Sequence, residues 1–321
     1  MENSQRPNVL VTGASGLVGT KVLQAIGRRR ETFGAVVALD VRSPPGDRRI
    51  DGADYVAGDI RDPAIGDLLQ SRNIDTVVHL AAIVAPGKNS SPELEYQVDV
   101  LGTENILKAC SAHAIVQFVG LSSGAAYGYH ADNPVPLRET DALRGNDSFT
   151  YSKHKRLVEE MLTRFRKLAP GVRQLIFRPG TILGAGARSP VSAIFEGRFV
   201  IGVVGADSPF VMIWDEDVAA AIVKGVLERR EGIYNLAGDG VLTLREIAKR
   251  AGKPYLPLPA DLLKAALWIL KKAGLSARGP EGVDFLRYRP VLANDRLKAE
   301  FGFVPEKTSA EVFAYYLGAM R

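Results

Sequence analysis

Short, continuously apolar runs alternate along the chain with longer segments in which apolar residues recur every three or four positions. Apolar runs of this length predict strands that are buried on both faces. The longer segments predict amphipathic helices. The expected strands cover residues 9–11, 35–40, 55–57, 76–80, 116–121 and 175–177. The first expected helix follows residues 9–11 and continues to Ile26. The other expected helices cover residues 63–70, 92–112 and 149–168.

This alternation predicts an α/β fold, a doubly wound parallel sheet with helices on both faces. Its crossovers should be right-handed, and a ligand should lie at the carboxyl ends of the strands. Beyond residue 184 the pattern becomes irregular, with a strand expected over 233–236 and helices over 215–228, 244–251, 261–272 and 309–320. We therefore expect a larger domain over residues 1–183 and a smaller lobe over 184–321, with segments that cross back to the sheet.

One predicted helix is apolar around most of its circumference, over residues 262–272. Such a helix is typical of a buried or substrate-covering element, and also of a helix that lies on a membrane surface. We favour the first interpretation.

Composition narrows the protein class. The 321 residues have a net charge of +5, with 46% hydrophobic and 24% charged residues, as in an ordinary globular protein. Basic clusters such as residues 28–30 are short and lack interleaved aromatic residues, so no nucleic-acid partner is expected. The single cysteine, Cys110, excludes an intramolecular disulfide and a cysteine-based metal cluster, and no metal is predicted.

The sequence also bears on location. Its first seven residues lack the apolar core of a signal peptide. No apolar run reaches the roughly 18 residues of a membrane span. The expectation is a cytoplasmic protein without a membrane partner.

A glycine-rich turn follows the first predicted strand, with glycines at positions 13, 16 and 19. Glycines suit a backbone that turns sharply, approaches a ligand closely and lets the next helix pack on the strand. The N–H groups at the start of that helix then face a phosphate. The spacing is one residue longer than the usual dinucleotide fingerprint, so an ordinary turn is the alternative. The phosphate-binding candidates are Gly13, Ser15, Gly16, Leu17, Val18 and Gly19.

Asp40 ends the second predicted strand, 21 residues after Gly19. A carboxylate there accepts both hydroxyls of the adenosine ribose and repels a 2′-phosphate, which favours NAD over NADP. Arg42, two residues further on, would accommodate that phosphate if it turned inward. NADP therefore stays as the less favoured cofactor.

Two other strand ends offer cofactor contacts. Asp59 and Ile60 follow the third strand, where an aspartate can accept the adenine amino group. His79 is interpreted as a packing residue at the end of the fourth strand. Directly after His79 come Leu80, Ala81 and Ala82. These residues would let the backbone lie against a flat ligand.

The strongest chemical signal is a tyrosine and a lysine four residues apart. Tyr151 and Lys155 share one face of a predicted helix, and Ser123 ends the fifth strand. A tyrosine, with an unperturbed pKa of about 10, becomes a base near neutral pH only where its phenolate is favoured. A nearby ammonium and a positively charged nicotinamide would favour it in a desolvated cleft. Ser123 would donate a hydrogen bond to the substrate oxygen.

Together these segments resemble the extended short-chain dehydrogenase/reductases, the NAD-dependent epimerase/dehydratase family. The resemblance covers nearly the whole chain. Its motifs are residues 12–19, Asp40, 58–62, 79–82, 122–128, 151–155, 178–180, 214–219, 234–238 and 297–305.

The resemblance implies a Rossmann-type domain, bound NAD and a triad of Ser123, Tyr151 and Lys155. In the family the tyrosine is the acid/base, the lysine holds the nicotinamide ribose, and the serine positions the reacting oxygen. Pro179 is implied as a further cofactor contact. The family also suggests a homodimer through the helices after the fourth and fifth strands.

The sequence departs from the family in three places. Asp99 stands where the family often has asparagine. Residues 180–184 lack the asparagine, and residues 208–212 the arginine, that usually hold a sugar-nucleotide diphosphate. We therefore expect an NAD-dependent oxidoreductase that acts on an uncharged alcohol or ketone. The alternatives are a nucleotide-sugar epimerase or dehydratase, such as a UDP-glucose 4-epimerase-like enzyme, and a non-catalytic NAD sensor, against which the intact triad argues.

Overall fold

The computed structural model describes residues 6–85, 87, 90–187, 191–274 and 279–320. Residues 1–5, on which the location prediction partly rests, lie outside that description. The chain forms two compact units that interleave along the sequence. The sheet unit comprises the chain up to Ser122 with Leu157–Arg178 and Asp215–Tyr234, and the triad unit comprises Ser123–Arg156, Pro179–Trp214 and Asn235–Arg321.

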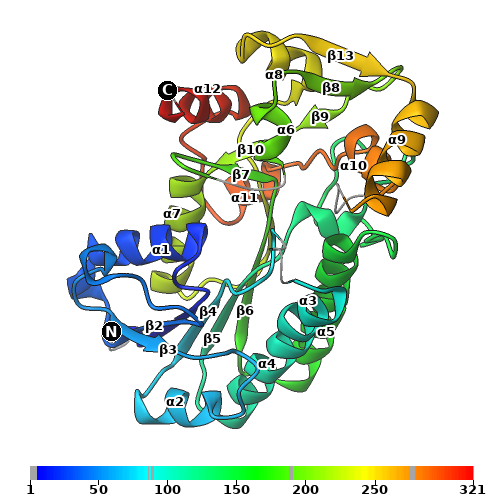
Figure 1. Ribbon diagram of the computed structural model, residues 1–321. Helices are drawn as coiled ribbons and strands as arrows, with labels where there is room; N and C mark the ends of the chain where they lie inside the picture. The colour runs from blue at the N-terminus through cyan, green and yellow to red at the C-terminus, as the bar shows by residue number, and fades with distance from the viewer. Residues whose placement is uncertain (1–5, 86, 88–89, 188–190, 275–278, 321) are drawn as a thin grey trace. The chain divides into compact units, whose positions relative to one another are not determined.

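The sheet unit is built on a seven-stranded sheet in the order β11-β6-β5-β4-β1-β2-β3 (Figure 1). The pairings from β3 through to β6 are parallel, which confirms the doubly wound Rossmann-type fold. Its strands are β1 Val9–Thr12, β2 Val36–Asp40, β3 Asp54–Ala57, β4 Thr76–His79, β5 Gln117–Leu121, β6 Arg173–Pro179 and β11 Gly232–Leu236. The strand expected over 233–236 thus returns to the sheet edge beside β6.

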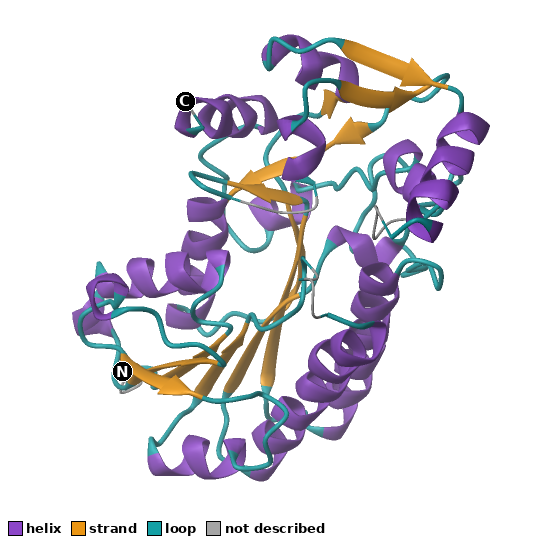
Figure 2. Cartoon of the chain, viewed as in Figure 1, coloured by secondary structure: helices purple, strands orange, loops and turns teal. Residues whose placement is uncertain are grey.

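Helices cover both faces of this sheet (Figure 2). They are α1 Leu17–Gly27, α2 Ile65–Ser71, α3 Pro92–Tyr96, α4 Thr103–Ala112, α5 Thr150–Leu168 and α7 Asp215–Leu227. Apolar residues of α2, α4 and α5 form one core with those of the central strands. Helices α1 and α7 pack side by side. The single helix expected over 92–112 contains a π-helical segment, Gln97–Gly102, between α3 and α4.

The triad unit consists of short elements. Three strand pairs join β7 Thr181–Leu183 to β10 Met212–Trp214, β8 Val200–Val203 to β13 Tyr255–Leu258, and β9 Pro209–Phe210 to β12 Leu242–Thr243. Its other helices are α6 Ser192–Glu196, α8 Leu244–Arg250, α9 Ala260–Lys272, α10 Gly282–Arg287, α11 Asp295–Ala299 and α12 Ser309–Ala319. The main core of this unit includes Phe195, Phe210 and Phe313.

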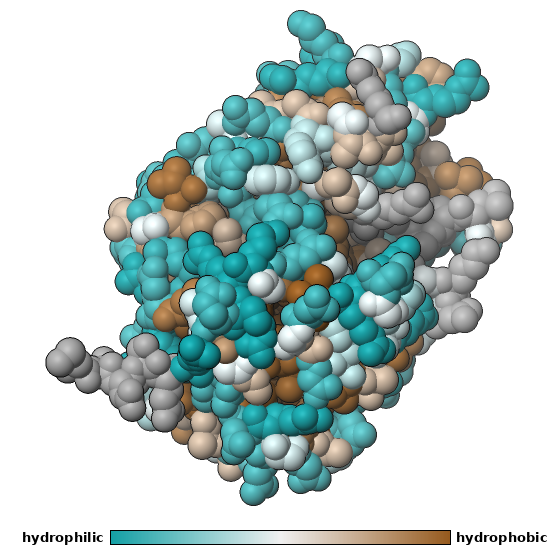
Figure 3. Space-filling view, turned by 90° about the vertical axis from the view of Figure 1, so that its left-hand side faces the viewer, coloured by the Kyte–Doolittle hydropathy of each residue, from teal (hydrophilic) through white to brown (hydrophobic). Residues whose placement is uncertain are grey.

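Helix α9 forms where the sequence predicts it, but it is not buried. Leu263 faces the core of the triad unit, whereas Leu262, Trp268 and Ile269 are exposed. Elsewhere, on the face of the molecule seen in Figure 3, hydrophilic residues predominate and apolar ones occur in small groups. Among the described residues, no helix combines the length and hydropathy that a membrane crossing requires.

Candidate active site

The glycine turn of the sheet unit leaves room for backbone and ligand only. Gly13 has a φ of +67°, and a Cβ there would lie 2.7 Å from the Ala81 nitrogen. A Cβ at Gly19 would lie 2.2 Å from the Gly13 oxygen, so α1 packs directly on the turn. Within the described part of the chain, no side chain caps the N-terminus of α1 at Gly16, and the first turn of α1 holds no acidic residue. The turn therefore fits an anionic diphosphate, which the N–H groups and the helix dipole would stabilise.

Asp40 lies against this turn. Its carboxylate accepts the Ser15 N–H at 3.0 Å and the Arg42 N–H at 3.2 Å, while the Ser15 hydroxyl donates to the Arg42 carbonyl at 2.7 Å. The structure thus brings together three residues predicted from separate parts of the sequence. A carboxylate has about four acceptor sites, so these two bonds leave capacity for ribose hydroxyls.

Asp59, the predicted adenine contact, is held in an ion pair. Its Oδ2 lies 2.6 Å from Arg61 Nη2, and the hydrogen bond from Arg61 lowers the pKa of the Asp59 carboxyl. Ile60 is buried, and its Cδ1 would lie 2.6 Å from a Cβ at Gly102. Asp59 is therefore ionised at neutral pH, and its contact with adenine stays a prediction.

The end of β4 is organised by threonine hydroxyls. The N–H groups of Leu80 and Ala81 lie 3.2 and 3.4 Å from Thr12 Oγ1. His79 is buried, with its Nδ1 2.8 Å from the Thr12 hydroxyl and its Nε2 3.0 Å from the Thr103 hydroxyl. These contacts agree with the interpretation of His79 as a packing residue. Ala82 comes next in the chain and is half-buried.

Asp99, one of the departures from the family, has a structural partner. It is buried in the π-helical segment, and its Oδ1 accepts the Ile83 N–H at 2.8 Å. The Thr103 hydroxyl donates to its backbone oxygen at 2.7 Å. An asparagine oxygen would accept the same N–H, so the change preserves support for the loop after β4.

All three predicted triad residues lie within the triad unit. Ser123 caps the 3₁₀ turn Gly124–Tyr127, and its hydroxyl accepts the Ala125 N–H at 3.1 Å. Tyr151 and Lys155 lie in the first turns of α5, with the Lys155 ammonium 5.6 Å from the centre of the Tyr151 ring. Tyr151 packs against the cluster that contains Ala125.

Ser152 is a supporting residue that sequence reasoning missed. It is completely buried, and its hydroxyl donates to the Ala125 carbonyl at 2.6 Å and accepts the Asn146 N–H at 3.0 Å. One side chain thereby fixes the start of α5, which holds Tyr151, to the turn that begins after Ser123. Its place within the tyrosine–lysine motif was the available signal.

Arg289 is a second residue that the sequence did not single out. Its guanidinium carbon lies 4.2 Å from the centre of the Phe210 ring and 4.5 Å from that of Phe285, and its Nη2 donates to Thr181 Oγ1 at 3.1 Å. Phe285 belongs to the cluster against which Tyr151 packs. The triad unit therefore holds a cation that packs on one member of that cluster.

Pro179 and Gly124 are neighbours within the triad unit. A Cβ at Gly124 would lie 3.4 Å from the Pro179 oxygen and 3.1 Å from Leu292 Cδ1. The predicted cofactor contact Pro179 thus lies beside the turn that Ser123 caps. Its contact with a cofactor stays a prediction.

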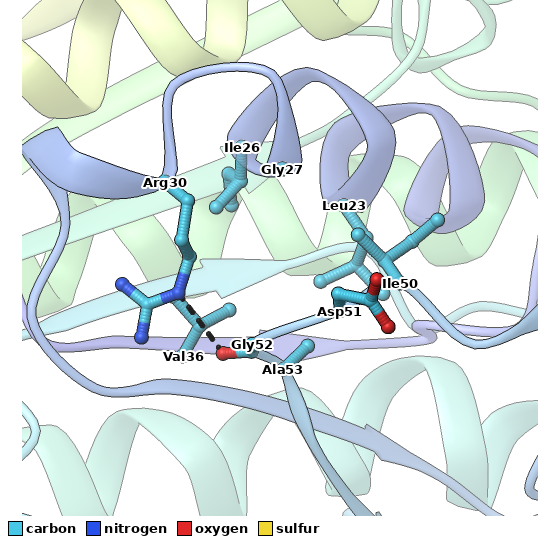
Figure 4. Close-up of a pocket in the computed structure, with 9 residues that line it drawn as sticks. All are labelled: Leu23, Ile26, Gly27, Arg30, Val36, Ile50, Asp51, Gly52 and Ala53. Atoms are coloured by element: carbon cyan, nitrogen blue, oxygen red, sulfur yellow. Dashed lines mark hydrogen bonds between the residues drawn. The ribbon is translucent and has the colours of Figure 1, made fainter.

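Two other features of the described residues are a depression on the sheet unit and the acidic, histidine and cysteine side chains. A depression on the sheet unit lies between α1, β2 and residues 50–53, where Arg30 Nε donates to the Gly52 carbonyl at 3.1 Å (Figure 4). It has no room for a water molecule, and no predicted site residue lines it. The described residues contain no group of three or more His, Cys, Asp or Glu placed to hold a metal ion. Burial raises the pKa of Cys110 to about 12.

Sequence comparison identifies the family. The profile of the family described as "NAD dependent epimerase/dehydratase family" matches residues 9–206. The chain belongs to this family. It is therefore an NAD-dependent enzyme, and the glycine turn described above fits that cofactor.

The chain is also similar to individual proteins. An uncharacterized protein of Mycobacterium tuberculosis is 27% identical over 98% of this chain and 85% of its own length. The N-acetyl-alpha-D-glucosaminyl-diphospho-ditrans,octacis-undecaprenol 4-epimerase of Escherichia coli is 32% identical over 80% of this chain and 77% of its own. The solved UDP-glucose 4-epimerase of Thermus thermophilus with NAD has a TM-score of 0.74 and 24% identity, and covers 98% of this chain and 99% of its own.

Proposed function

We propose that the protein moves a hydride between NAD and a carbinol carbon, with Tyr151 as the acid/base. The observation that carries the proposal is the joint placement of Ser123, Tyr151 and Lys155 in one unit, with the turn after Ser123 hydrogen-bonded to the first turn of α5 through Ser152. A redox sensor that binds NAD without catalysis has no need of this arrangement.

The sheet unit would hold the adenosine diphosphate half of the cofactor. The glycine turn and the start of α1 would bind the diphosphate, and Asp40 the adenosine ribose. When bound, NAD supplies a hydride acceptor at C4 of its nicotinamide.

The triad supplies proton handling. Tyr151 would accept the hydroxyl proton as the carbinol C–H bond breaks, and return a proton when the carbonyl is reduced. The Lys155 ammonium favours the phenolate form of Tyr151 through its positive charge, and would hold the nicotinamide ribose. The Ser123 hydroxyl would donate to the substrate oxygen.

For the net reaction we propose epimerisation of a sugar attached to a diphosphate, carried by a nucleotide or a lipid. The relative from Escherichia coli, an epimerase of an undecaprenyl diphosphate sugar by name, supports this choice. Arg289 supports it as well, because its guanidinium packs on Phe285 of the cluster against which Tyr151 packs, and a guanidinium suits a diphosphate.

Net oxidation of an uncharged alcohol is the second candidate. Val211 and Met212 are buried, and a Cβ at Gly180 would lie 2.9 Å from Val211 Cγ2. The segments in which relatives usually place diphosphate-binding side chains therefore pack against each other here. This observation favours a substrate without a diphosphate.

Product analysis separates the two candidates. The protein is incubated with NAD and either UDP-sugars, a polyprenyl diphosphate sugar or simple secondary alcohols. Epimerisation gives an altered sugar without accumulation of NADH, whereas net oxidation gives NADH in proportion to product. A protein that binds NAD but transforms none of these substrates would contradict the hydride-transfer proposal.

Two other expectations belong to the proposal. A homodimer through the helices after β4 and β5 is proposed from the family, and sedimentation velocity of the purified protein tests it. A cytoplasmic location is proposed from the sequence, and fractionation of cells that express the full chain tests that.

A further inference from the structure

Helix α9 presents an apolar stripe away from its own unit. Leu262 and Ile269 lie two turns apart on one line along the helix, and Trp268 lies beside them, with exposed fractions of 55%, 59% and 51%. The other side of α9 packs Leu263 and Leu267 against the ends of β8 and β13. A helix on the surface of a globular unit normally turns polar residues to water. Helix α9 has the reverse arrangement over this stripe.

The adjoining strand pair adds to the exposed apolar surface. Ile201 of β8 and Leu256 of β13 are register partners, so their side chains lie on the same face, and both are exposed. Strand β13 ends at Leu258, two residues before α9 begins. The apolar surface thus belongs to consecutive elements.

Positive charge is concentrated in the same segment. Residues 245–272, which include α9 and β13, contain seven Lys or Arg and two Asp or Glu, a net charge of +5. This equals the net charge of all 321 residues, so the rest of the chain is neutral in sum. At the end of the stripe, the Lys272 ammonium lies 4.2 Å from the centre of the Trp268 ring.

These features fit a phospholipid surface better than a second copy of the chain. Asp284 and Glu281 pair with Lys264 and Lys271, so the segment and these two acidic residues together carry a net charge of +3. A twofold dimer through α9 would bring two such positive surfaces together. The exposed side chains of α9 offer on the order of 400 Å², about half of the roughly 800 Å² that each partner buries in a standard interface. A bilayer with anionic lipids takes up the apolar stripe and neutralises the charge. Tryptophan and lysine suit the headgroup level, because each joins an apolar body to a polar tip.

We propose that α9, with the basic segment 245–272, docks the protein on the surface of a bilayer that contains anionic phospholipids. The helix lies in the plane of the interface and does not cross the membrane. Docking does not depend on the proposed reaction. Given the proposed reaction, the enzyme would meet the lipid-carried form of its proposed substrate at this surface.

Vesicle sedimentation of the full chain tests the proposal. The protein should sediment with vesicles of equal parts phosphatidylcholine and phosphatidylglycerol, and not with phosphatidylcholine alone. The double variant L262E/I269E should bind about tenfold less, because it places two carboxylates in the stripe. The matched control is Leu168→Glu, a change at an exposed residue at the end of α5 in the sheet unit. This control should bind as the wild type does.

A second measurement does not depend on the folding of these variants. In the Trp214→Phe protein, Trp268 is the single tryptophan, and its emission should shift to shorter wavelength with the anionic vesicles alone. No sedimentation with anionic vesicles, or equal binding by L262E/I269E, would overturn the proposal. Self-association without lipid that L262E/I269E abolishes would also overturn it, in favour of a second copy.

Failure of docking and failure of the proposed function are distinguishable. Turnover of a soluble substrate by L262E/I269E should equal that of the wild type, since the stripe contains no triad residue. A protein that binds vesicles but has no hydride-transfer activity would retain the docking proposal and lose the proposed function.

Discussion

Tyr151 is the residue on which the proposed chemistry depends most directly. Its ring packs against the cluster around Ala125, and its hydroxyl is the proposed proton acceptor. Tyr151→Phe removes the hydroxyl and keeps the ring. Turnover should fall by about 10²- to 10⁴-fold, the usual contribution of a positioned acid/base, while the Kd for NAD stays within about twofold. Steady-state rates and a fluorescence titration measure the two quantities, and equal turnover in both proteins would refute the mechanism.

Asp40 is the residue on which the proposed cofactor preference depends at the same scale. Asp40→Asn removes the charge and retains an oxygen that accepts the Ser15 N–H, so the turn should keep its shape. The preference for NAD over NADP should fall by about tenfold, equivalent to about 1.4 kcal/mol, because the repulsion of the 2′-phosphate is lost. Binding titrations with both cofactors provide the ratio. An unchanged ratio would exclude Asp40 as the ribose contact.

At the scale of elements, Ser152 joins the start of α5 to the turn after Ser123. Ser152→Ala removes the partner of the buried Ala125 carbonyl and of the partly buried Asn146 N–H. The free energy of unfolding should fall by about 1–3 kcal/mol. Turnover should also fall, and the pH profile of kcat should move, because Tyr151 is no longer held in place.

The matched control for Ser152 lies on the same helix. The Thr163 hydroxyl donates to the Glu159 carbonyl within α5, and Thr163→Ala should leave kcat and its pH profile unchanged. Urea unfolding and kcat measured across pH give both readouts. If the Ser152→Ala protein loses stability but keeps the wild-type pH profile of kcat, Ser152 has a structural role and does not position Tyr151.

At the scale of the whole molecule, Cys110 reports on the opening of the sheet unit. It is buried in the core, and desolvation raises the pKa of its thiol to about 12. Since the folded pKa lies above the ordinary value of about 8.5, the buried thiol stays protonated where the unfolded one ionises. The contribution of the Cys110 thiol to the free energy of unfolding is therefore complete below about pH 8.5, and it declines as the pH rises toward 12. A thiol reagent at neutral pH should therefore label Cys110 only when the core opens.

Bound cofactor should slow this labelling. NAD at about 100 times its Kd stabilises the folded state by about 2.7 kcal/mol, so labelling should slow by about 100-fold if opening destroys the cofactor site. NAD that binds tightly without slowing the labelling would show that the core opens independently of the glycine turn. The L168E protein is a suitable control. Because Leu168 is exposed, this change should leave the rate of Cys110 labelling, and its decrease with NAD, as in the wild type.

The sequence by itself determined much of the sheet unit. Runs such as residues 9–11 and 35–39 are apolar throughout, and only strands buried on both faces explain such runs beside helical segments. The glycine turn and the four-residue spacing of Tyr151 and Lys155 are also local properties, because a tight turn and one helical turn are fixed by neighbouring residues. The family followed from these local motifs.

Tertiary structure decided what depends on residues far apart in the chain. Arg289 contacts Thr181 across 108 positions, and Ser152 contacts Ala125 across 27, and no spacing rule reveals such pairs. The strand pairs of the triad unit are only two to four residues long, too short to show a period. Helix α9 was predicted from its sequence. The sequence of a helix that is apolar on most sides does not predict which side its neighbours will cover. Packing against β8 and β13 covers one side only, and it leaves Leu262, Trp268 and Ile269 exposed.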